Sequence, residues 1–366
     1  LNPEGRIVGQ QAGEIPADLL AQVIERVIVE SDERGTLDRT PLRFPIETPP
    51  EGPLAYPAGI LADGAGGRLF VSDTGHHRVL VVRLNADGRG GEVEAVIGGA
   101  PGFADGSFGD ARLRGPHGLE LDGDRLYIAD TGNNAVRVAD LSAGRLETVA
   151  GTGELAETLG RGGRATEVPL RSPWGLAWHE DALLIGMAGS HQIWRLDLAS
   201  GEIAPWAGTG AEALVDGPLD QAALSQPSGL ASDGRRLFFA DSEDSGIRWA
   251  DLAPGGNVHT IVGTGLFDFG DRDGIGDEAR LQHPLDVAWH DDKVYVADTY
   301  NGKIKIIDPE TREVRSWLGD QGELWEPGAL SIANDRVYIA DTNHHRIMTA
   351  ELGNDRLEEV EIRGLG

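Results

Sequence analysis

The chain has 366 residues, of which 60 are acidic and 32 are Lys or Arg, so its net charge is −28 at neutral pH. This excess of negative charge excludes binding of nucleic-acid backbones or anionic membranes by simple electrostatics. The absence of cysteine excludes disulfides, thiolate metal sites and thiol redox chemistry within these residues. The sequence contains no run of about 18 apolar residues, so no membrane-spanning helix is predicted. The composition leaves the compartment open, and we favour the cytoplasm over export.

Residues 1–31 predict a turn, a short strand near residues 6–8 and a helix. After Pro16, apolar residues recur at helical spacing, at Leu19, Leu20, Val23, Ile24, Val27 and Ile28. This order resembles the C-terminal end of a thioredoxin-like domain, although the Cys-x-x-Cys motif of that family lies upstream of this element and is absent here. The resemblance implies a natural polypeptide that extends upstream by about a hundred residues, the size of a small domain. The alternative is a helix packed on the side of the main domain.

Residues 32–55 are first charged and then rich in proline, which is typical of an extended linker. Within it, residues 41–45 are predicted as a short edge strand. Residues 56–366 form the main domain, in which one unit recurs six times. The units start near residues 56, 115, 172, 226, 283 and 326, each with a proline and a short apolar run.

Each unit contains four predicted strands. In the second unit these are residues 118–122, 125–130, 136–141 and 146–151, and in the last unit residues 357–362 take the fourth place. Four antiparallel strands at a period of roughly fifty residues are typical of a propeller blade. The first two strands are almost wholly apolar, so neighbouring blades must cover both faces. We therefore predict an all-β, six-bladed β-propeller, because six stacked blades close a ring without free edges.

Several aromatic residues occupy repeated positions in these units. Tyr127, Tyr295 and Tyr338 should lie at equivalent places in second strands. Four tryptophans recur in first and fourth strands, and we expect them to pack between or within blades rather than to form a ligand cage. They are Trp178, Trp206, Trp289 and Trp317.

The repeated pattern Tyr-x-Ala-Asp-Thr-x-Asn/His, preceded by Pro-x-Gly-Leu, resembles the NHL repeat and covers residues 56–362. Together with the thioredoxin-like element, the chain is similar to bacterial members of the family of NHL-repeat-containing protein 2. In that family a thioredoxin-like domain precedes a six-bladed NHL propeller. The resemblance implies, as one alternative, a thiol-redox protein whose active cysteines lie in an upstream domain.

Five second strands end in an aspartate, and these carboxylates would form a ring around the propeller. We interpret them as structural turn residues that accept the N–H groups of their own turn, rather than as a cation site. They are Asp73, Asp130, Asp241, Asp298 and Asp341; the copy at Met187 has lost the acid. Arg78, Lys303 and Arg346 follow five residues after their aspartates and are predicted to pair with them.

Two histidine pairs are the weak candidates for a metal site. His76, His77, His344 and His345 fill turn positions that Asn133 and Asn134 occupy in the second unit, and the structural interpretation is favoured. Closure of the ring between the first and last blades would make the two turns neighbours. The acidic segment 268–277 is the candidate for Ca²⁺, although it lacks the EF-hand spacing. We otherwise expect no cofactor.

The residues after the opening prolines are predicted to face the central channel. His117, Trp174 and Asp286 are the candidates for a binding face there. A metal-dependent hydrolase or lyase would need several such ligands to converge on one ion, and this set is too apolar for that. Long connectors between the blades gather on one face of the ring, where function is most often found.

The leading functional prediction is a non-enzymatic scaffold that binds a protein or peptide on the connector face. We expect a monomer that binds neither nucleic acid nor membrane. The metal-dependent hydrolase or lyase and the thiol-redox protein remain the alternatives, and no catalytic residue is predicted in this chain.

Overall fold

A computed structural model describes residues 2–9, 17–40 and 52–365 of the chain. It divides into two units, Leu1–Pro49 and Pro50–Gly366, which we describe separately. In the first unit the predicted helix is present as α1 (Ala17–Glu33). Its aliphatic stripe is open to solvent, with Leu19, Leu20, Val23, Ile24, Ile28 and Val29 each 40–56% exposed.

The strand predicted near residues 6–8 does not form. The turn before it does, since the backbone N–H of Asn2 donates to the carbonyl of Arg6. A strand needs a hydrogen-bonding partner, and none of the described residues pairs with this segment. The edge strand predicted at residues 41–45 lies outside the described residues.

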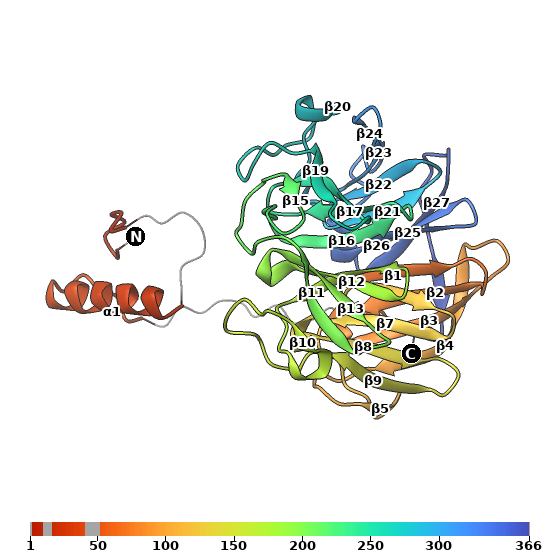
Figure 1. Ribbon diagram of the computed structural model, residues 1–366, viewed down its shortest axis with the longest axis horizontal. Coiled ribbons are helices and arrows are strands. Elements are labelled where there is room, and N and C mark those ends of the chain that lie inside the picture. The colour runs from red at the N-terminus through yellow and green to blue at the C-terminus, as the bar shows by residue number, and fades with distance from the viewer. Residues whose placement is uncertain (1, 10–16, 41–51, 366) are drawn as a thin grey trace. The chain divides into compact units, whose positions relative to one another are not determined.

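The second unit consists of six antiparallel sheets arranged in chain order, so the predicted six-bladed propeller is confirmed (Figure 1). Blade 1 contains β1 (Pro57–Asp63), β2 (Arg68–Asp73), β3 (Arg78–Leu84) and β4 (Gly90–Gly98). Blade 2 contains β6 (Leu119–Asp122), β7 (Arg125–Asp130), β8 (Ala135–Asp140) and β9 (Arg145–Ala150). Blade 3 contains β11 (Pro173–His179), β12 (Ala182–Met187), β13 (Gln192–Asp197) and β14 (Glu202–Ala207).

The remaining blades repeat this order. Blade 4 contains β16 (Pro227–Ser232), β17 (Arg236–Asp241), β18 (Gly246–Asp251) and β19 (Asn257–Val262). Blade 5 contains β21 (Asp286–His290), β22 (Lys293–Asp298), β23 (Lys303–Asp308) and β24 (Glu313–Leu318). Blade 6 contains β25 (Pro327–Ala333), β26 (Arg336–Asp341), β27 (Arg346–Glu351) and β28 (Glu358–Glu359). The first strand of each blade lines the central channel.

Each connector that is long enough adds a short outer strand to the blade that follows it. These strands are β5 (Gly106–Ser107), β10 (Gly163–Arg164), β15 (Gly217–Pro218) and β20 (Gly274–Ile275). Blade 1 has no connector before it and instead receives β29 (Glu361–Arg363), which pairs in parallel with β4. The segment 357–362, predicted as one strand of the last unit, is therefore divided between two blades. The change of sheet occurs at Val360, whose N–H still bonds to Ile347 of blade 6, while the N–H of Glu361 bonds to Arg89 of blade 1.

The hydrophobic core lies between the blades, as the apolar first and second strands require. One cluster joins Tyr127 and Val136 of blade 2 to Leu183 and Ile185 of blade 3. The predicted tryptophan packing is present at all four positions. Three of the rings contact another aromatic ring, Trp178 on Tyr127, Trp289 on Phe238 and Trp317 on Tyr295, with centroids 5.0–5.4 Å apart. Trp206 is partly buried and packs against the core between blades 3 and 4.

The two ends of the ring differ in what they carry. One end, the connector face, carries the start and end of each connector, the opening prolines and the Asp-Thr turns, which form short 3₁₀ helices such as Thr131–Asn133. The middle of each long connector runs along the outer edge of its blade toward the other end, where the N–H of Gly276, for example, donates to the carbonyl of Arg312. The other end, the hairpin face, carries the tight links between first and second strands, such as residues 123–124. None of the helices in the described part of the chain is long and apolar enough to cross a membrane.

Candidate functional site

The five turn aspartates are buried and fix each connector to its blade. In every case Oδ1 accepts a backbone N–H at 2.7 Å from the residue that ends the segment leading into the blade: Ala55, Arg114, Ser225, Gln282 and Trp325. The prediction that they accept N–H groups of their own turn was therefore wrong in this detail. The structural interpretation of these residues is nevertheless the one that the contacts favour, since a buried carboxylate is retained where it satisfies buried donors.

The hydroxyl that follows each of these aspartates joins its blade to the next one. Thr131 Oγ1, for example, donates to the carbonyl of Pro173 at 2.7 Å. The same bond recurs from Thr74 to Pro116, Ser242 to Pro284, Thr299 to Pro327 and Thr342 to Pro57, at 2.7–2.9 Å. The last of these closes the ring between blades 6 and 1. The Asp-Thr signature thus combines a bond within the blade with a bond to its neighbour.

A cation neutralises Oδ2 of each aspartate, by two different routes. Arg78 and Arg346 pair with their aspartates at 2.7 and 2.8 Å, as predicted. In blades 2 and 4 the cation comes instead from seven residues after the acid, from Arg137 and Arg248, both fully buried. The prediction for Lys303 was wrong, because this side chain pairs with connector carboxylates.

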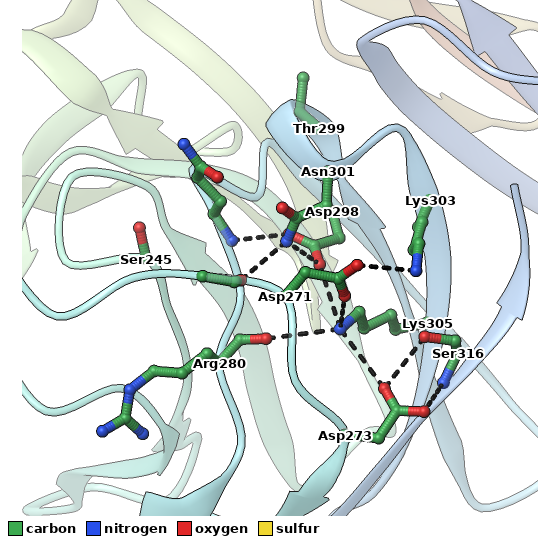
Figure 2. A network of polar contacts seen from close by, with 12 residues as sticks. Ser245, Asp271, Asp273, Arg280, Asp298, Thr299, Asn301, Lys303, Lys305 and Ser316 are labelled. Carbon is green, nitrogen blue, oxygen red and sulfur yellow. Dashed lines mark hydrogen bonds and ion pairs between the residues drawn. The ribbon is translucent and has the colours of Figure 1, made fainter. Parts of the chain in front are cut away.

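In blade 5 the buried cation is Lys305, shown in Figure 2. Its Nζ lies 2.7 Å from Asp271, 3.4 Å from Asp273 and 3.5 Å from Asp298, and Lys303 binds the second oxygen of Asp271 at 2.7 Å. Burial opposes the shift, but hydrogen bonds from the two lysines hold the pKa of Asp271 below its ordinary value. The carboxylates proposed for Ca²⁺ are therefore already bound by cations of the chain, since Asp268 and Asp277 also pair with arginines.

Blade 3 has neither the aspartate nor its buried cation. Where the acid is replaced by Met187, the cation is replaced as well, by Trp194, whose indole N–H donates to Gln192. Gln192 in turn donates to the carbonyl of Gly208. The acid and its partner were lost together, which is expected for a structural ion pair, since one partner left alone would be a buried unpaired charge.

The four turn histidines hold backbone and carboxylate groups through their Nδ1 atoms. His76 and His344 contact Asp73 and Asp341 at 2.8 and 2.9 Å. His77 and His345 accept backbone N–H groups of the next blade, at Gly115 and Tyr56, at 3.1 and 3.0 Å. Ring closure brings the two turns near each other, as predicted. Among the described residues, no three His, Asp or Glu side chains are arranged to hold a metal ion.

Asp244 is a buried acid that the sequence reasoning missed. It occupies the place of Asn133, which donates to Asp130 Oδ2 at 2.8 Å in blade 2. Among the described residues, neither oxygen of Asp244 has a hydrogen bond of good geometry. Burial raises its pKa, although the Ser225 hydroxyl opposes this. The signal for it was visible, because an acid stands where the other turns have a donor.

The central channel holds a cavity of about 210 Å³. Its walls approach closely, since a Cβ on Gly118 or Gly175 would collide with the carbonyl of the next blade. This explains the glycine of the Pro-x-Gly motif. In blade 5 the glycine is replaced by Asp286, whose Oδ2 accepts the N–H of Leu330 at 2.9 Å.

The predicted channel residues lie at the cavity in different ways. Trp174 and Asp286 line it, and the ring of His117 lies on that of Trp174, with centroids 4.0 Å apart. Glu120 also lines the cavity and was missed, although an acid in an otherwise apolar first strand signals it. Burial raises the pKa of both Asp286 and Glu120 to about 7 and lowers the pKa of His117 to about 4.

Most exposed apolar side chains of the propeller lie on connectors and turns of the connector face, whereas Val96 lies on β4 and Ile275 on the outer strand β20, opposite Glu313. Phe267 is 92% exposed, and further exposed residues occur on every connector and on the turn of blade 5. These are Phe103, Leu155, Leu159, Val215, Phe269, Ile275, Tyr300 and Trp325.

Comparison with known proteins identifies the repeat. The NHL repeat model matches residues 54–82 and 113–139. NHL repeat-containing protein 2 of Bos taurus is 36% identical over 345 residues, covering 85% of this chain and 47% of that protein. Protein SUPPRESSOR OF QUENCHING 1, chloroplastic, of Arabidopsis thaliana is 35% identical over 332 residues, covering 86% and 31%. The chain spans about half or less of the length of these relatives.

Solved structures share the fold at low identity. Virginiamycin B lyase of Staphylococcus aureus has a TM-score of 0.52 and 14% identity, with coverage of 84% of this chain and 85% of that one. Regucalcin of Agrobacterium tumefaciens has a TM-score of 0.54 and 16% identity, with coverage of 86% and 96%. Such identities show the fold alone. By its repeats and relatives, this chain is an NHL-repeat six-bladed β-propeller, homologous to NHL repeat-containing protein 2.

Proposed function

We propose that this chain is a non-catalytic interaction module that binds a protein or peptide through its connector face. One observation carries the proposal. Among the described residues of the propeller, every exposed large apolar side chain except Val96 belongs to a connector or to an Asp-Thr turn. Apolar side chains gathered on one surface are typical of interaction sites. The ring beneath them is rigid, which suits loops that carry a binding function.

Selection of binders from a library of random displayed peptides tests this proposal. Peptides selected on the folded chain should bind about tenfold or more weakly to the double variant Phe267→Ser/Phe269→Ser, which removes two exposed anchors. The matched control is Asp124→Ser/Asp181→Ser, which changes two exposed residues on the hairpin face. Binders that lose affinity only in the control, or a selection that enriches no binder, would contradict the proposal.

A metal-dependent hydrolase or lyase is the second candidate, and the carboxylates of Glu120 and Asp286 in the channel favour it. A divalent ion held there would stabilise the folded chain by mass action. Under the scaffold proposal, EDTA leaves the melting temperature unchanged. A drop of several degrees on adding EDTA, abolished in Asp286→Asn, would support the metal enzyme instead.

A thiol-redox function remains a prediction that rests on the thioredoxin-like resemblance. It would reside outside these 366 residues, because they contain no cysteine. Reduction of a disulfide substrate by a polypeptide that joins a thioredoxin-like domain to this chain, compared with this chain alone, is the measurement that decides it.

A further inference from the structure

The charges of the connectors are unevenly distributed around the ring. The two connectors that lead into blades 2 and 3, residues 99–115 and 152–172, balance acidic residues with arginines. The three that lead into blades 4, 5 and 6, residues 209–226, 264–283 and 320–326, contain 11 acidic residues and two arginines. Cations outside these connectors pair with five of the acids, Asp216, Asp271, Asp273, Asp277 and Asp320. The remaining acids still outnumber the two arginines, so the connectors into blades 4, 5 and 6, here called the acidic half, carry the larger excess of negative charge, and those into blades 2 and 3 are called the neutral half.

The exposed aromatic residues gather on this acidic half. Phe267 and Phe269 lie on the connector into blade 5, Tyr300 on the turn of blade 5 and Trp325 on the connector into blade 6. Over the neutral half the only exposed aromatic residue among the described ones is Phe103. Exposed aromatic groups thus occur on two of the three acidic connectors and on the turn of blade 5.

Five residues on adjacent segments are here called the rim cluster: Glu243, His283, Tyr300, Trp325 and Glu326. Trp325 precedes Glu326 in the chain, and its ring packs against His344 of the blade 6 turn, with centroids 5.6 Å apart. The ring of His283 stacks on Tyr300, with centroids 4.6 Å apart and planes at 19°. Its Nδ1 lies 3.9 Å from Glu243, and the charges of both glutamates act on it. Tyr300 and Trp325 are 55% and 54% exposed, so both offer ring surface to a ligand.

Backbone and side-chain bonds fix the rim cluster in place. The N–H of Tyr300 donates to the carbonyl of Gln282, next to His283. Thr299, the residue before Tyr300, donates to Pro327, the residue after Glu326. Glu326 itself accepts from Asn343 at 2.8 Å. The three segments are therefore held side by side, and the aromatic rings and carboxylates are already positioned before a ligand arrives.

Elsewhere in this chain, aromatic rings and carboxylates together bind an arginine side chain. On the hairpin face, the guanidinium of Arg236 lies 5.0 Å from the ring centroid of Phe238 and 5.6 Å from that of Trp249. It also pairs with Asp233 at 2.9 Å and with Glu310 at 2.7 Å. Aromatic rings together with carboxylates thus bind a guanidinium by cation–π attraction and charge-assisted hydrogen bonds. The rim cluster also combines aromatic rings with carboxylates, and none of its five residues is an arginine or a lysine.

We infer that the acidic half of the connector face binds a protein segment that carries arginine or lysine, one of whose cations sits against Tyr300 and Trp325 between Glu243 and Glu326. This inference rests on the proposed function and specifies its partner. Phe267 and Phe269 supply apolar contacts on the connector that ends at His283, and Asn301, next to Tyr300, donates to the carbonyl of Gly270, next to Phe269. We therefore expect the segment to alternate basic and apolar residues. Association is accelerated by the opposite charges and weakened by salt.

Fluorescence anisotropy with three labelled synthetic peptides tests this. The first alternates arginine and leucine, the second replaces each arginine by the uncharged isostere citrulline, and the third replaces it by glutamate. The arginine peptide should bind about tenfold more tightly than the citrulline peptide at low salt, and the glutamate peptide should not bind. Tyr300→Ala and the double variant Glu243→Gln/Glu326→Gln should each weaken the arginine peptide about three- to tenfold.

Matched variants on the neutral half serve as controls. Leu155→Ala and Glu154→Gln change exposed residues of the connector into blade 3 and should leave binding unchanged, and the melting temperature shows that every variant is folded. Equal binding of the arginine and citrulline peptides, lost only in Phe267→Ser/Phe269→Ser, would overturn the basic partner while the proposed function stands. Peptides of every charge that bind without regard to any connector variant would overturn both.

Discussion

At the scale of single residues, the Asp-Thr signature of the repeat is explained by assembly rather than by chemistry. The aspartate satisfies a connector N–H, and the threonine bonds to the opening proline of the next blade. Both bonds recur in five of the six blades. A residue pair with these tasks is retained in a repeat whatever the protein binds, so its presence says nothing about the partner.

Removing the aspartate should cost most where its cation is most buried. Asp130→Ala leaves the fully buried Arg137 with the part-exposed Asp105 as its remaining carboxylate partner, and should lower the free energy of unfolding by about 3 kcal/mol. Asp341→Ala should cost less, because the side chain of Arg346 is 29% exposed and keeps a bond to the carbonyl of Glu323. Denaturant unfolding of the two variants measures the difference. Equal losses would contradict this ranking.

Asp244 offers the opposite case, a residue whose replacement should stabilise the chain. Asparagine restores the donor that Asn133 supplies in blade 2, so Asp244→Asn should add about 1–3 kcal/mol at pH 8. The pKa of Asp244 is raised in the folded state, so its stabilising neutral form is lost as pH rises. The advantage of the variant should therefore grow as pH rises above the ordinary pKa of an aspartate.

Thermal unfolding at several pH values measures this, with Asp220→Asn as the matched control. Asp220 is an exposed acid of the connector into the same blade, and its replacement should change little. A lower melting temperature for Asp244→Asn than for the parent chain at pH 8 would show that its carboxylate is satisfied after all.

Residue roles were the part of the structure least accessible to sequence. That the aspartates and histidines are turn residues follows from local patterns, but their partners do not. Thr131 bonds to a proline 42 residues away, and Asp130 to an N–H 16 residues before it. Such partners are set by how blades stack, which is tertiary information. Lys303 shows the same limit. The aspartate five residues before it, Asp298, pairs with Lys305, and Lys303 pairs with Asp271 instead.

At the scale of elements, the strands could be predicted from the sequence because the same pattern of apolar and turn residues occurs in six units. The second strand of blade 2 was predicted at its observed bounds, Arg125–Asp130. The last unit lacked this help, since nothing local marks the point where the chain leaves blade 6 for blade 1. The helix α1 was readable from its apolar spacing, whereas the short strand before it was not, because a strand depends on a partner.

The terminal strand β29 gives an element-scale prediction. It supplies the outer pairing of blade 1 that connectors give to blades 2–5, and Ile362 packs against the core between blades 6 and 1. Removing residues 361–366 should therefore lower the melting temperature by several degrees. Amide hydrogen exchange should increase in β4, whose edge is then unpaired. Arg363→Ala is the control, because this exposed side chain can be removed while the backbone pairing of β29 and the packing of Ile362 and Leu365 remain. Unchanged exchange in β4 after the deletion would contradict the closing role of β29.

At the scale of the whole molecule, the channel places two acids on opposite walls, since blades 2 and 5 stand three steps apart in a ring of six. Burial raises the pKa of Glu120 and of Asp286 to about 7. In both cases burial is the main cause, opposed by backbone hydrogen bonds, and the two groups lie on different walls of one cavity. The two carboxyl groups should therefore titrate independently.

Because the two carboxyl groups should titrate independently, the gains in melting temperature from replacing each of them should add. A carboxyl group whose pKa is raised in the folded state stabilises it below its unfolded pKa, and this contribution is lost as pH rises through the folded value. Asp286→Asn keeps an oxygen for the N–H of Leu330 but cannot ionise. Its melting temperature should therefore exceed that of the parent chain, by an amount that increases from pH 4 to pH 7 and is constant above pH 8. Glu120→Gln should behave in the same way, and the double variant should show the sum of the two gains, as sites without direct interaction do. Asp124→Asn, an exposed acid on the hairpin that follows Glu120, is the control without such a gain. An advantage that shrinks as pH rises would mean that the channel acids are ionised and stabilised in the folded chain, and a double variant well below the sum would mean that the two walls share one proton or one cation.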